Sequence, residues 1–184
     1  MKALIVVDMQ KDFINGTLGT KEAQGIVESV VKRVSSSKGE LILFTQDTHG
    51  EDYLSTPEGK KLPIAHCIEG TDGWKINESV FNAWRENKNT IVAADLKNNT
   101  FTKPVFGSVK LVEYLKNKSE KNEISEIELL GLCTDVCVVS NAIMLKNFLL
   151  NTEISVNTKC CAGITPQSHT EALNTMKMCQ INLI

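Results

Sequence analysis

Short apolar runs that alternate with helical patterns constrain the fold of this chain more than any other feature of the sequence. The runs are too short for helices, and several are rich in β-branched residues, which is typical of strands buried on both faces of a parallel sheet. They are Lys2–Asp8, Leu41–Gln46, Ile91–Ala94 and Ile127–Gly131, with weaker candidates at Glu153–Val156 and Ile181–Ile184. We therefore expect a parallel sheet of about six strands.

Helical patterns fill the segments between these runs. They span Lys21–Ser35, Asn77–Glu86, Ser108–Lys118, Thr134–Leu150 and Pro166–Met178. Alternating strands and helices predict an α/β fold, doubly wound and Rossmann-like, with helices on both faces of the sheet. We expect residues 1–184 to form one domain. The longest segment without a clear element is Asp47–Trp74, and a loop of that length in a compact domain is usually functional or disordered.

The charge and composition of the chain exclude several classes of partner. Lys and Arg number 20 and Asp and Glu number 22, a net charge of -2, so the sequence has no basic footprint for nucleic acid. No apolar stretch approaches the length of a membrane-spanning helix, and the start of the chain lacks a signal-peptide pattern. We expect a cytoplasmic protein, in which six cysteines need not form disulfides.

Reactive side chains follow several of the predicted strands. Ligands of open α/β sheets bind beyond the carboxyl ends of the strands, where the strand order reverses. The side chains at those positions are Asp8 after the first strand, Asp47 and His49 after the second, Lys103 after the third, and Cys133 and Cys137 after the fourth. We expect a site at this edge.

The two cysteines of GLCTDVCVVSNA, Cys133 and Cys137, have two main interpretations. In the first turn of a helix, Cys137 would lie in a field that favours a thiolate, and the Cys133 N–H could help to bind an oxyanion. Alternatively, both are small buried hydrophobic residues, as most free cysteines are. Their spacing disfavours a zinc pair. Packing is the better interpretation for the other cysteines, which are Cys67, Cys160, Cys161 and Cys179.

Asp8 and Lys103 each have a structural explanation when they are considered alone. Asp8 could cap a turn or form an ion pair, and Lys103 could be a solvated surface side chain. Together with Cys137 they form a coherent catalytic set. The lysine would keep the aspartate ionised, and the aspartate would accept the thiol proton and return it to a leaving amine.

The long loop contains carboxylate and imidazole groups that could bind one divalent metal ion. They are Asp47, His49, Glu58 and His66. Hydrogen-bonded or solvated loop residues are the alternative interpretation. Asp135 could simply be an acidic residue at a helix N-terminus. We expect His169 to be solvated or capping, without a functional role.

Three motifs resemble those of the isochorismatase-like cysteine hydrolase superfamily, and the nicotinamidase/pyrazinamidase branch is the most similar. They are VDMQKDF (7–13), TKPVFGS (102–108) and GLCTDVCVVSNA (131–142), in the family's order. The resemblance implies that Asp8, Lys103 and Cys137 are catalytic. It also implies that the N–H groups of Cys133 and Cys137 bind the oxyanion, and that the Leu132–Cys133 peptide bond is cis.

The resemblance also predicts a cofactor, an assembly and a substrate pocket. A divalent metal, zinc first with iron or manganese as alternatives, would be bound by Asp47, His49 and His66, with Glu58 in place of a second loop histidine. Members of the superfamily are commonly homo-oligomers, which we expect here. Phe13 and Phe106 are candidate walls of the substrate pocket, although both could be ordinary core aromatics.

These observations predict a cysteine-dependent amidohydrolase of a small primary amide, with nicotinamide as the leading substrate and a thioester intermediate. One alternative is a metal-independent hydrolase of another amide or a carbamoyl compound. A second is a non-catalytic α/β domain that binds a ligand or partner. The absence of a GxGxxG or phosphate-loop pattern after Lys2–Asp8 counts against the second alternative.

Overall fold

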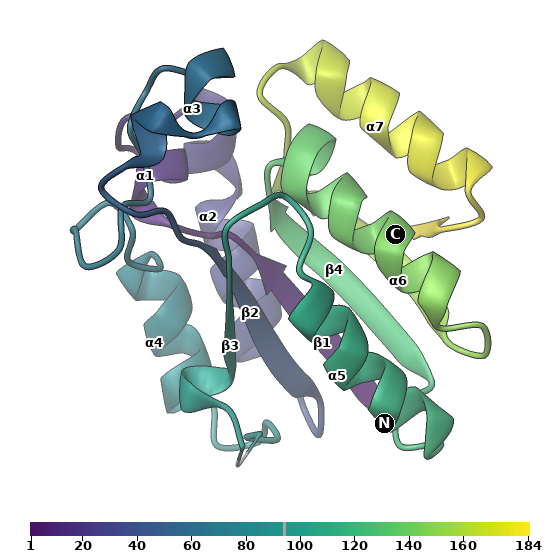
Figure 1. Ribbon diagram of the computed structural model, residues 1–184. Coiled ribbons are helices and arrows are strands. Elements are labelled where there is room, and N and C mark those ends of the chain that lie inside the picture. Colours follow the sequence, from purple (N-terminus) through teal and green to yellow (C-terminus); the bar gives the residue numbers. More distant parts are fainter. Residues whose placement is uncertain (94) are drawn as a thin grey trace.

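A parallel sheet of six strands forms the centre of the protein in a computed structural model that describes residues 1–93 and 95–184 (Figure 1). The strands are β1 (Lys2–Val7), β2 (Leu41–Asp47), β3 (Thr100–Lys103), β4 (Glu126–Leu132), β5 (Glu153–Ala162) and β6 (Asn182–Leu183). Their order is β3-β2-β1-β4-β5-β6, and each neighbouring pair is parallel. The strand order reverses at β1, which confirms the predicted doubly wound fold class.

Helices cover both faces of this sheet. They are α1 (Lys11–Ile14), α2 (Lys21–Ser35), α3 (Pro57–Lys61), α4 (Glu78–Glu86), α5 (Val109–Glu120), α6 (Val139–Phe148) and α7 (Pro166–Met178), with short turns at η1 (Tyr53–Ser55), η2 (Lys97–Asn99) and η3 (Thr134–Val138). Helix α2 packs with α4 on one face, whereas α5, α6 and α7 form a row on the other (Figure 1). Coverage on both sides explains why the central strands are almost entirely apolar.

Capping side chains set the start of the helices that the sequence predicts best. The Thr20 hydroxyl accepts the Ala23 N–H at 3.0 Å at the start of α2. Thr165 and Ser168 form a reciprocal capping box at the start of α7. Both helices have the predicted bounds. The residues predicted to open α4 and α5, Asn77 and Ser108, are instead their capping residues.

The third strand is not where the sequence pattern places it. The prediction of Ile91–Ala94 is wrong for its described part, because Ile91 forms only a single bridge to Leu41; Ala94 lies outside the described residues. The Asn99 side chain replaces strand pairing here. It accepts the Ala93 N–H at 2.9 Å and donates to the Ile42 carbonyl at 2.7 Å. Strand β3 therefore begins after this asparagine and pairs with the second half of β2.

Two predicted segments have more internal structure than their patterns indicate. The predicted helix Thr134–Leu150 opens with a single π-helical turn, η3, before α6 begins. The loop Asp47–Trp74 contains η1 and α3.

All six cysteines are free thiols in the described chain. Cys179 is exposed, so the prediction that this side chain packs in the interior is wrong.

Gly131 allows β4 to approach β1 closely just before the turn that follows β4. Its φ is +120°, and an added Cβ would collide with the backbone of Val7. A register shift between Leu129 and Gly131 marks the same place in the pairing of β4 with β5. The irregularity turns the chain out of the sheet, so the residues after Leu132 lie at its carboxyl edge.

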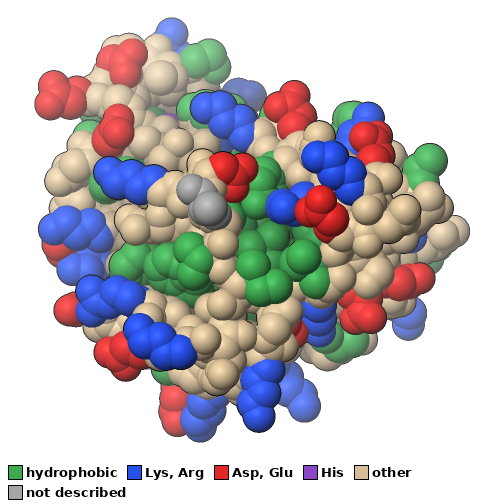
Figure 2. Space-filling view, turned by 90° about the horizontal axis from the view of Figure 1, so that it is seen from below, with side chains coloured by type: hydrophobic (Ala, Val, Ile, Leu, Met, Phe, Trp, Pro, Cys, Tyr) green, Lys and Arg blue, Asp and Glu red, His purple; other side chains and the backbone are tan. Residues whose placement is uncertain are grey.

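The opposite face of the molecule contains the amino ends of the strands. Figure 2 shows acidic and basic side chains intermingled on this face around a hydrophobic area, in keeping with the small net charge of -2. Within residues 1–93 and 95–184, the structure contains no helix that is both long enough and apolar enough to cross a bilayer.

Candidate active site

Asp8, Lys103 and Cys137 meet at the carboxyl edge of the sheet, although they lie far apart in the sequence. Asp8 directly follows β1, Lys103 ends β3, and Cys137 lies in the turn η3 after β4. Lys103 Nζ is 2.6 Å from Asp8 Oδ2 and 3.5 Å from Cys137 Sγ. All three side chains are buried. One lysine therefore contacts both a carboxylate and a thiol in a site shielded from water.

Thr45 on β2 orients the Asp8 carboxylate and was not among the residues predicted from the sequence. Its hydroxyl donates to Asp8 Oδ1 at 2.7 Å, and its carbonyl and hydroxyl oxygens both lie near the Asp8 N–H, at 3.3 and 3.2 Å. Asp8 has a φ of +43°, a backbone conformation that Asp tolerates better than most residues. The only sequence signal for Thr45 is a hydroxyl near the end of an apolar strand.

Burial and neighbouring charges shift the pKa values of all three catalytic candidates. Burial raises the pKa of Asp8, and the opposing charge of Lys103 only partly offsets this. Burial together with the Asp8 charge raises the pKa of the Cys137 thiol well above its ordinary value. Burial lowers the pKa of Lys103, but Asp8 and the other nearby groups raise it more. The raised pKa favours a Cys137 thiol over a thiolate, and the thiol lies beside a carboxylate that can accept its proton.

The turn that carries Cys137 begins at a cis peptide bond between Leu132 and Cys133. The Cys133 carbonyl accepts the N–H groups of Val136 and Val138, at 3.1 and 3.0 Å, which closes the turn. Burial raises the pKa of Cys133 to about 12, so its thiol stays protonated and its candidate contribution is its backbone N–H.

Asn141 links this turn to the loop that follows Lys103. Its side-chain nitrogen donates to the carbonyls of Cys137 and Phe106, at 2.8 and 3.1 Å, and its oxygen accepts the Ser108 N–H at 3.0 Å. The side chain is fully buried. Asn141 is part of GLCTDVCVVSNA, but it was assigned no role from the sequence, because its partners Ser108 and Phe106 are 33 and 35 residues away.

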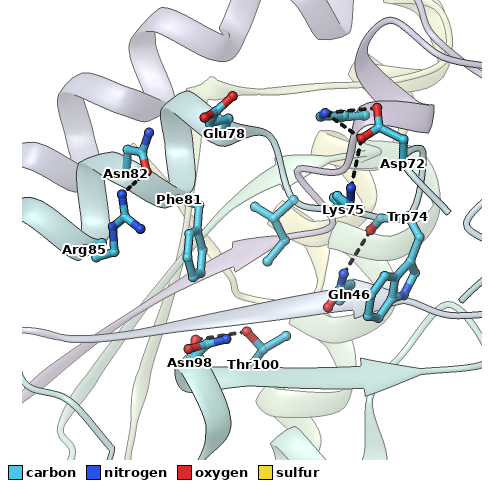
Figure 3. Close-up of a pocket in the computed structure, with 12 residues that line it drawn as sticks. Gln46, Asp72, Trp74, Lys75, Glu78, Phe81, Asn82, Arg85, Asn98 and Thr100 are labelled. Atoms are coloured by element: carbon cyan, nitrogen blue, oxygen red, sulfur yellow. Dashed lines mark hydrogen bonds and ion pairs between the residues drawn. The ribbon is translucent and has the colours of Figure 1, made fainter. Parts of the chain in front are cut away.

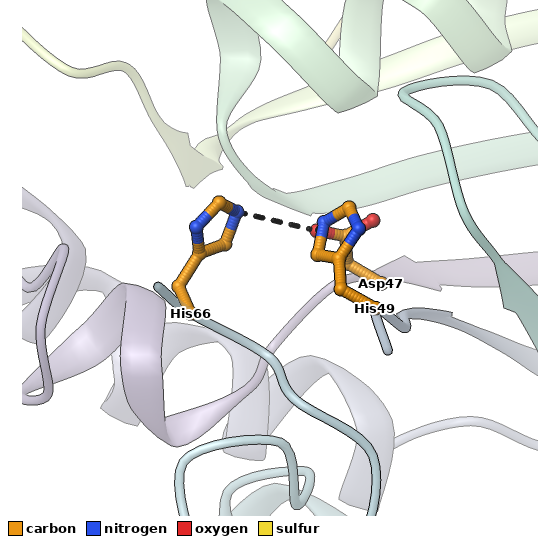
Figure 4. A group of neighbouring side chains, drawn as sticks. All are labelled: Asp47, His49 and His66. Carbon is orange, nitrogen blue, oxygen red and sulfur yellow. Dashed lines mark hydrogen bonds and ion pairs between the residues drawn. The ribbon is translucent and has the colours of Figure 1, made fainter. Parts of the chain in front are cut away.

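Asp47, His49 and His66 form a compact group of potential metal ligands beside the catalytic residues. Each offers one ligand atom, and these atoms lie within 4.8 Å of one another. The Nε2 atoms of His49 and His66 are 2.9 and 3.6 Å from Asp47 Oδ2, and Figure 4 shows both rings directed toward this carboxylate. Lys103 Nζ also lies 3.3 Å from Asp47 Oδ1, so this group adjoins the Asp8–Lys103–Cys137 cluster.

The chemistry of this donor set fits a divalent metal ion. His66 Nδ1 lies 2.8 Å from the Ile64 carbonyl, which leaves Nε2 directed at Asp47 as the ligand atom. Burial disfavours the Asp47 charge, but hydrogen bonds from His49 and His66 outweigh it and lower the pKa of Asp47. Two imidazoles and one ionised carboxylate suit zinc, iron or manganese.

Glu58 lies at the margin of this group rather than within it. Its Oε1 is 3.9 Å from His49 Nε2, and its side chain is 22% exposed on α3. The sequence predicted Glu58 as a metal ligand. In the structure a small movement of its side chain toward His49 would decide whether Glu58 joins the other potential ligands.

Gln10 holds the Asp47 backbone and was also missed at the sequence level. Its side-chain nitrogen donates to the carbonyls of Asp47 and Trp74, both at 2.8 Å, and its oxygen accepts the Asp47 N–H at 2.7 Å. This fully buried amide belongs to the motif VDMQKDF. Its place two residues after Asp8 in this motif was the available signal.

A cavity of about 200 Å³ lies between the thiol and the potential metal ligands. Its walls are mainly apolar. The apolar residues are Phe13, Leu18, Leu62, Phe106, Val136 and Ile164, and the polar or reactive ones are Thr20, Asp47, Glu58, His66, Cys133 and Cys137. Both predicted wall residues line it. Phe13 is nearly buried, with its ring 5.6 Å from that of His66, whereas Phe106 is 47% exposed at the rim. The cavity suits a small, largely apolar substrate.

A larger hollow of about 500 Å³ lies elsewhere, between α4, β2 and the loop before α4. Figure 3 shows Trp74 and Phe81 along it, with Asp72 paired to Lys75 at its upper edge. Asp72 also pairs with Lys11, so one carboxylate at this edge is shared by two lysines. Of the predicted catalytic and metal residues, Asp47, Glu58, His66 and Cys137 line the smaller cavity, whereas Asp8, His49 and Lys103 do not. The candidate site is therefore at the smaller cavity.

Comparison with known families agrees with this geometry. The model of the isochorismatase domain matches residues 2–184. The chain belongs to the isochorismatase family. This finding confirms the resemblance inferred from the three motifs, and it shows that the resemblance extends over nearly all of the chain.

Several relatives of the chain are named nicotinamidase or nicotinamidase/pyrazinamidase. The chain is 25% identical over 195 residues to the nicotinamidase/pyrazinamidase of Mycobacterium tuberculosis, covering 100% of this chain and 98% of the relative. It superposes on the crystal structure of Bacillus subtilis nicotinamidase/pyrazinamidase PncA with a TM-score of 0.80 at 26% identity, covering 99% and 98% of the two chains. Pyrazinamidase of Pyrococcus horikoshii in complex with zinc gives a TM-score of 0.77 at 25% identity, covering 100% and 98%.

Proposed function

We propose that this protein hydrolyses the C–N bond of a small primary amide, with nicotinamide, which gives nicotinate and ammonia, as the leading substrate. The observation that carries the proposal is the Asp8–Lys103–Cys137 cluster, in which Lys103 Nζ lies 2.6 Å from the carboxylate and 3.5 Å from the thiol. A cavity of about 200 Å³ adjoins the thiol and is large enough for one aromatic ring with its amide. Relatives named as nicotinamidases support the choice of substrate.

In the first half of the reaction, Asp8 acts as a general base and then as a general acid. It accepts the Cys137 proton while the sulfur attacks the amide carbonyl carbon, which forms a C–S bond. The peptide N–H groups of Cys133 and Cys137 stabilise the oxyanion. When the C–N bond breaks, Asp8 donates the proton to the departing nitrogen. Ammonia leaves, and the acyl group remains on Cys137 as a thioester.

In the second half, water replaces the sulfur. Asp8 is again ionised and accepts a proton from the water that attacks the thioester carbonyl. The C–S bond breaks, the acid product forms, and the proton returns to Cys137. The raised pKa of Asp8 suits a carboxyl group that both takes and gives a proton. Lys103 balances the negative charge that alternates between Asp8 and the sulfur.

Asp47, His49 and His66 are the residues that we propose to hold a divalent metal, with Glu58 as a further ligand when its side chain moves toward His49. When bound, the metal supplies a Lewis acid at one end of the cavity, which suits a ligand atom such as a ring nitrogen. Zinc is the first choice, because a zinc complex is described for the pyrazinamidase neighbour. Asp47 and His66 line the same cavity as Cys137, so a bound metal and the thiol could position opposite ends of one small substrate.

The test is ammonia release from nicotinamide by the wild type and by Cys137→Ala. We expect the substitution to abolish activity, because no other side chain of the cluster can form the thioester. Cys179→Ala is a matched control, since Cys179 is an exposed free thiol. Equal rates for wild type and Cys137→Ala would rule out the assigned nucleophile.

A further inference from the structure

The turn that carries Cys137 is fastened to the start of α7 by two polar contacts that the proposed mechanism does not use. Thr134 Oγ1 lies 2.8 Å from His169 Nδ1. The Asp135 carboxylate accepts the Ile164 N–H at 3.0 and 3.2 Å. Thr134 is fully buried. In Figure 1 the first turn of α7 lies beside the segment that opens α6, so two adjacent residues of the turn are tied to one neighbouring segment.

The position of His169 is set by the way α7 begins. Thr165 caps the helix by accepting the Ser168 N–H at 3.1 Å, and the His169 N–H donates to the Thr165 carbonyl at 3.0 Å. Pro166 occupies the first turn, where its fixed φ is already helical. These local constraints hold the His169 backbone in place independently of Thr134, so the ring can act as a fixed anchor.

Close packing also confines His169 from the side of β5. A Cβ added to Gly163 would lie 2.8 Å from His169 Cβ and 2.9 Å from its Cα and N. The residue after β5 must therefore be glycine for α7 to sit this close to the sheet. Since Gly163 directly precedes Ile164, the same segment positions the N–H group that binds Asp135.

The electrostatic surroundings favour a neutral ring. Burial lowers the pKa of His169, and the Asp135 carboxylate opposes this only in part. A neutral imidazole has one donor and one acceptor nitrogen, so it can pair with a hydroxyl group that is able to do either.

We propose that His169 is a positioning residue for the oxyanion hole: it holds Thr134, which lies between the two peptide groups, at Cys133 and Cys137, that bind the oxyanion. This role rests on the proposed thioester chemistry. Thr134 is the first residue after Cys133 and the third before Cys137, so a displacement of Thr134 moves the segment that carries both N–H groups. Hydrogen bonds to an oxyanion strengthen in the transition state, and a loosened turn therefore lowers kcat more than it raises KM.

Three substitutions at His169 separate positioning from packing. Asn places a polar atom where Nδ1 lies, two bonds beyond Cβ; Gln places its polar atoms one bond further away; Leu has none. We expect His169→Asn to retain most of kcat for ammonia release from nicotinamide. We expect His169→Gln and His169→Leu to lose about tenfold or more in kcat, with KM within about twofold, because small misplacement of catalytic groups costs up to about a hundredfold. Thr170→Val, on the next residue of α7, is the matched control.

A second measurement does not depend on turnover. The N–H groups of Val136 and Val138 close the turn by donating to the Cys133 carbonyl, so their hydrogen exchange reports its stability. We expect exchange at both residues to be about tenfold faster in His169→Gln than in wild type, and unchanged in His169→Asn and Thr170→Val.

The outcomes distinguish the two proposals. If the wild type releases no ammonia from nicotinamide, the proposed function fails for that substrate, and the exchange rates alone decide the role of His169. If exchange at Val136 and Val138 is the same in wild type, His169→Asn and His169→Gln, His169 does not hold the turn. Equal kcat values for His169→Asn and His169→Gln in an active enzyme would overturn the positioning role as well, even if both variants unfold at lower temperature.

Discussion

Glu128 provides the most quantitative test of how this fold is stabilised. It lies on β4 with 1% of its surface exposed. Arg33 of α2 binds both of its carboxylate oxygens, at 2.9 and 2.8 Å. Lys2 of β1 contacts it at 2.8 Å, and Asn157 of β5 donates to it at 2.9 Å. One carboxylate therefore connects a helix with three adjacent strands on the buried side of the sheet.

The contribution of this carboxylate follows from its pKa. Burial disfavours the charged form, but the bonds from Arg33, Lys2 and Asn157 outweigh burial and lower the pKa of Glu128 from 4.5 to about 2. Each unit of pKa corresponds to about 1.4 kcal/mol, so ionised Glu128 contributes about 3 kcal/mol to the free energy of unfolding at pH 7. Because the folded pKa is the lower one, this contribution is complete above about pH 5 and is lost as the pH falls toward 2.

The test compares urea unfolding of the wild type and Glu128→Gln at pH 7 and pH 3. We expect the variant to be less stable by about 3 kcal/mol at pH 7, and the difference to shrink to about 1 kcal/mol at pH 3. Glu28→Gln, which breaks an exposed pair with Lys32, should leave stability unchanged. Equal unfolding curves for the two variants, or a difference that is the same at both pH values, would refute this account.

Three further predictions concern the carboxyl edge of the sheet. Gly131→Ala should lower the free energy of unfolding by about 2 kcal/mol or more, because its Cβ meets the Val7 backbone at a φ of +120°; an unchanged urea midpoint would contradict the close approach. His66→Ala should lower the amount of zinc, iron or manganese that copurifies with the protein, measured by elemental analysis, and wild-type metal content would exclude His66 as a ligand. Cys133→Ala should keep most of the ammonia release that Cys137→Ala loses, since only the Cys133 backbone is used; equal losses would remove the distinction between the two thiols.

Several elements could be predicted from the sequence because their causes are local. Helices α2 and α7 have the predicted bounds, since Thr20 and Thr165 cap them within a few residues. Strands β1, β2 and β4 correspond to apolar runs whose length and composition leave little alternative to a buried parallel strand. The catalytic candidates were found because residues that follow neighbouring parallel strands must come to one edge of the sheet.

Most of the features missed at the sequence level have a different cause, which is a partner distant in the sequence. Asn99 takes the Ile42 carbonyl and moves β3 away from the apolar run that begins at Ile91. Thr45 and Gln10 became functional candidates only when their bonds to Asp8 and Asp47 were visible. The raised pKa of the Cys137 thiol comes from burial, which a helix-start pattern cannot report.

The sequence by itself therefore determined the doubly wound sheet, its well-capped helices and the chemical types of the groups at its carboxyl edge, because hydrophobic periodicity and capping act over a few residues. Only the tertiary structure decided which of these groups touch. It places Lys103 against Asp8, Asp47 and Cys137 at once, and it places His169 against Thr134. Such contacts depend on how strands and helices pack across the fold, and distances of this kind are not encoded in any single segment.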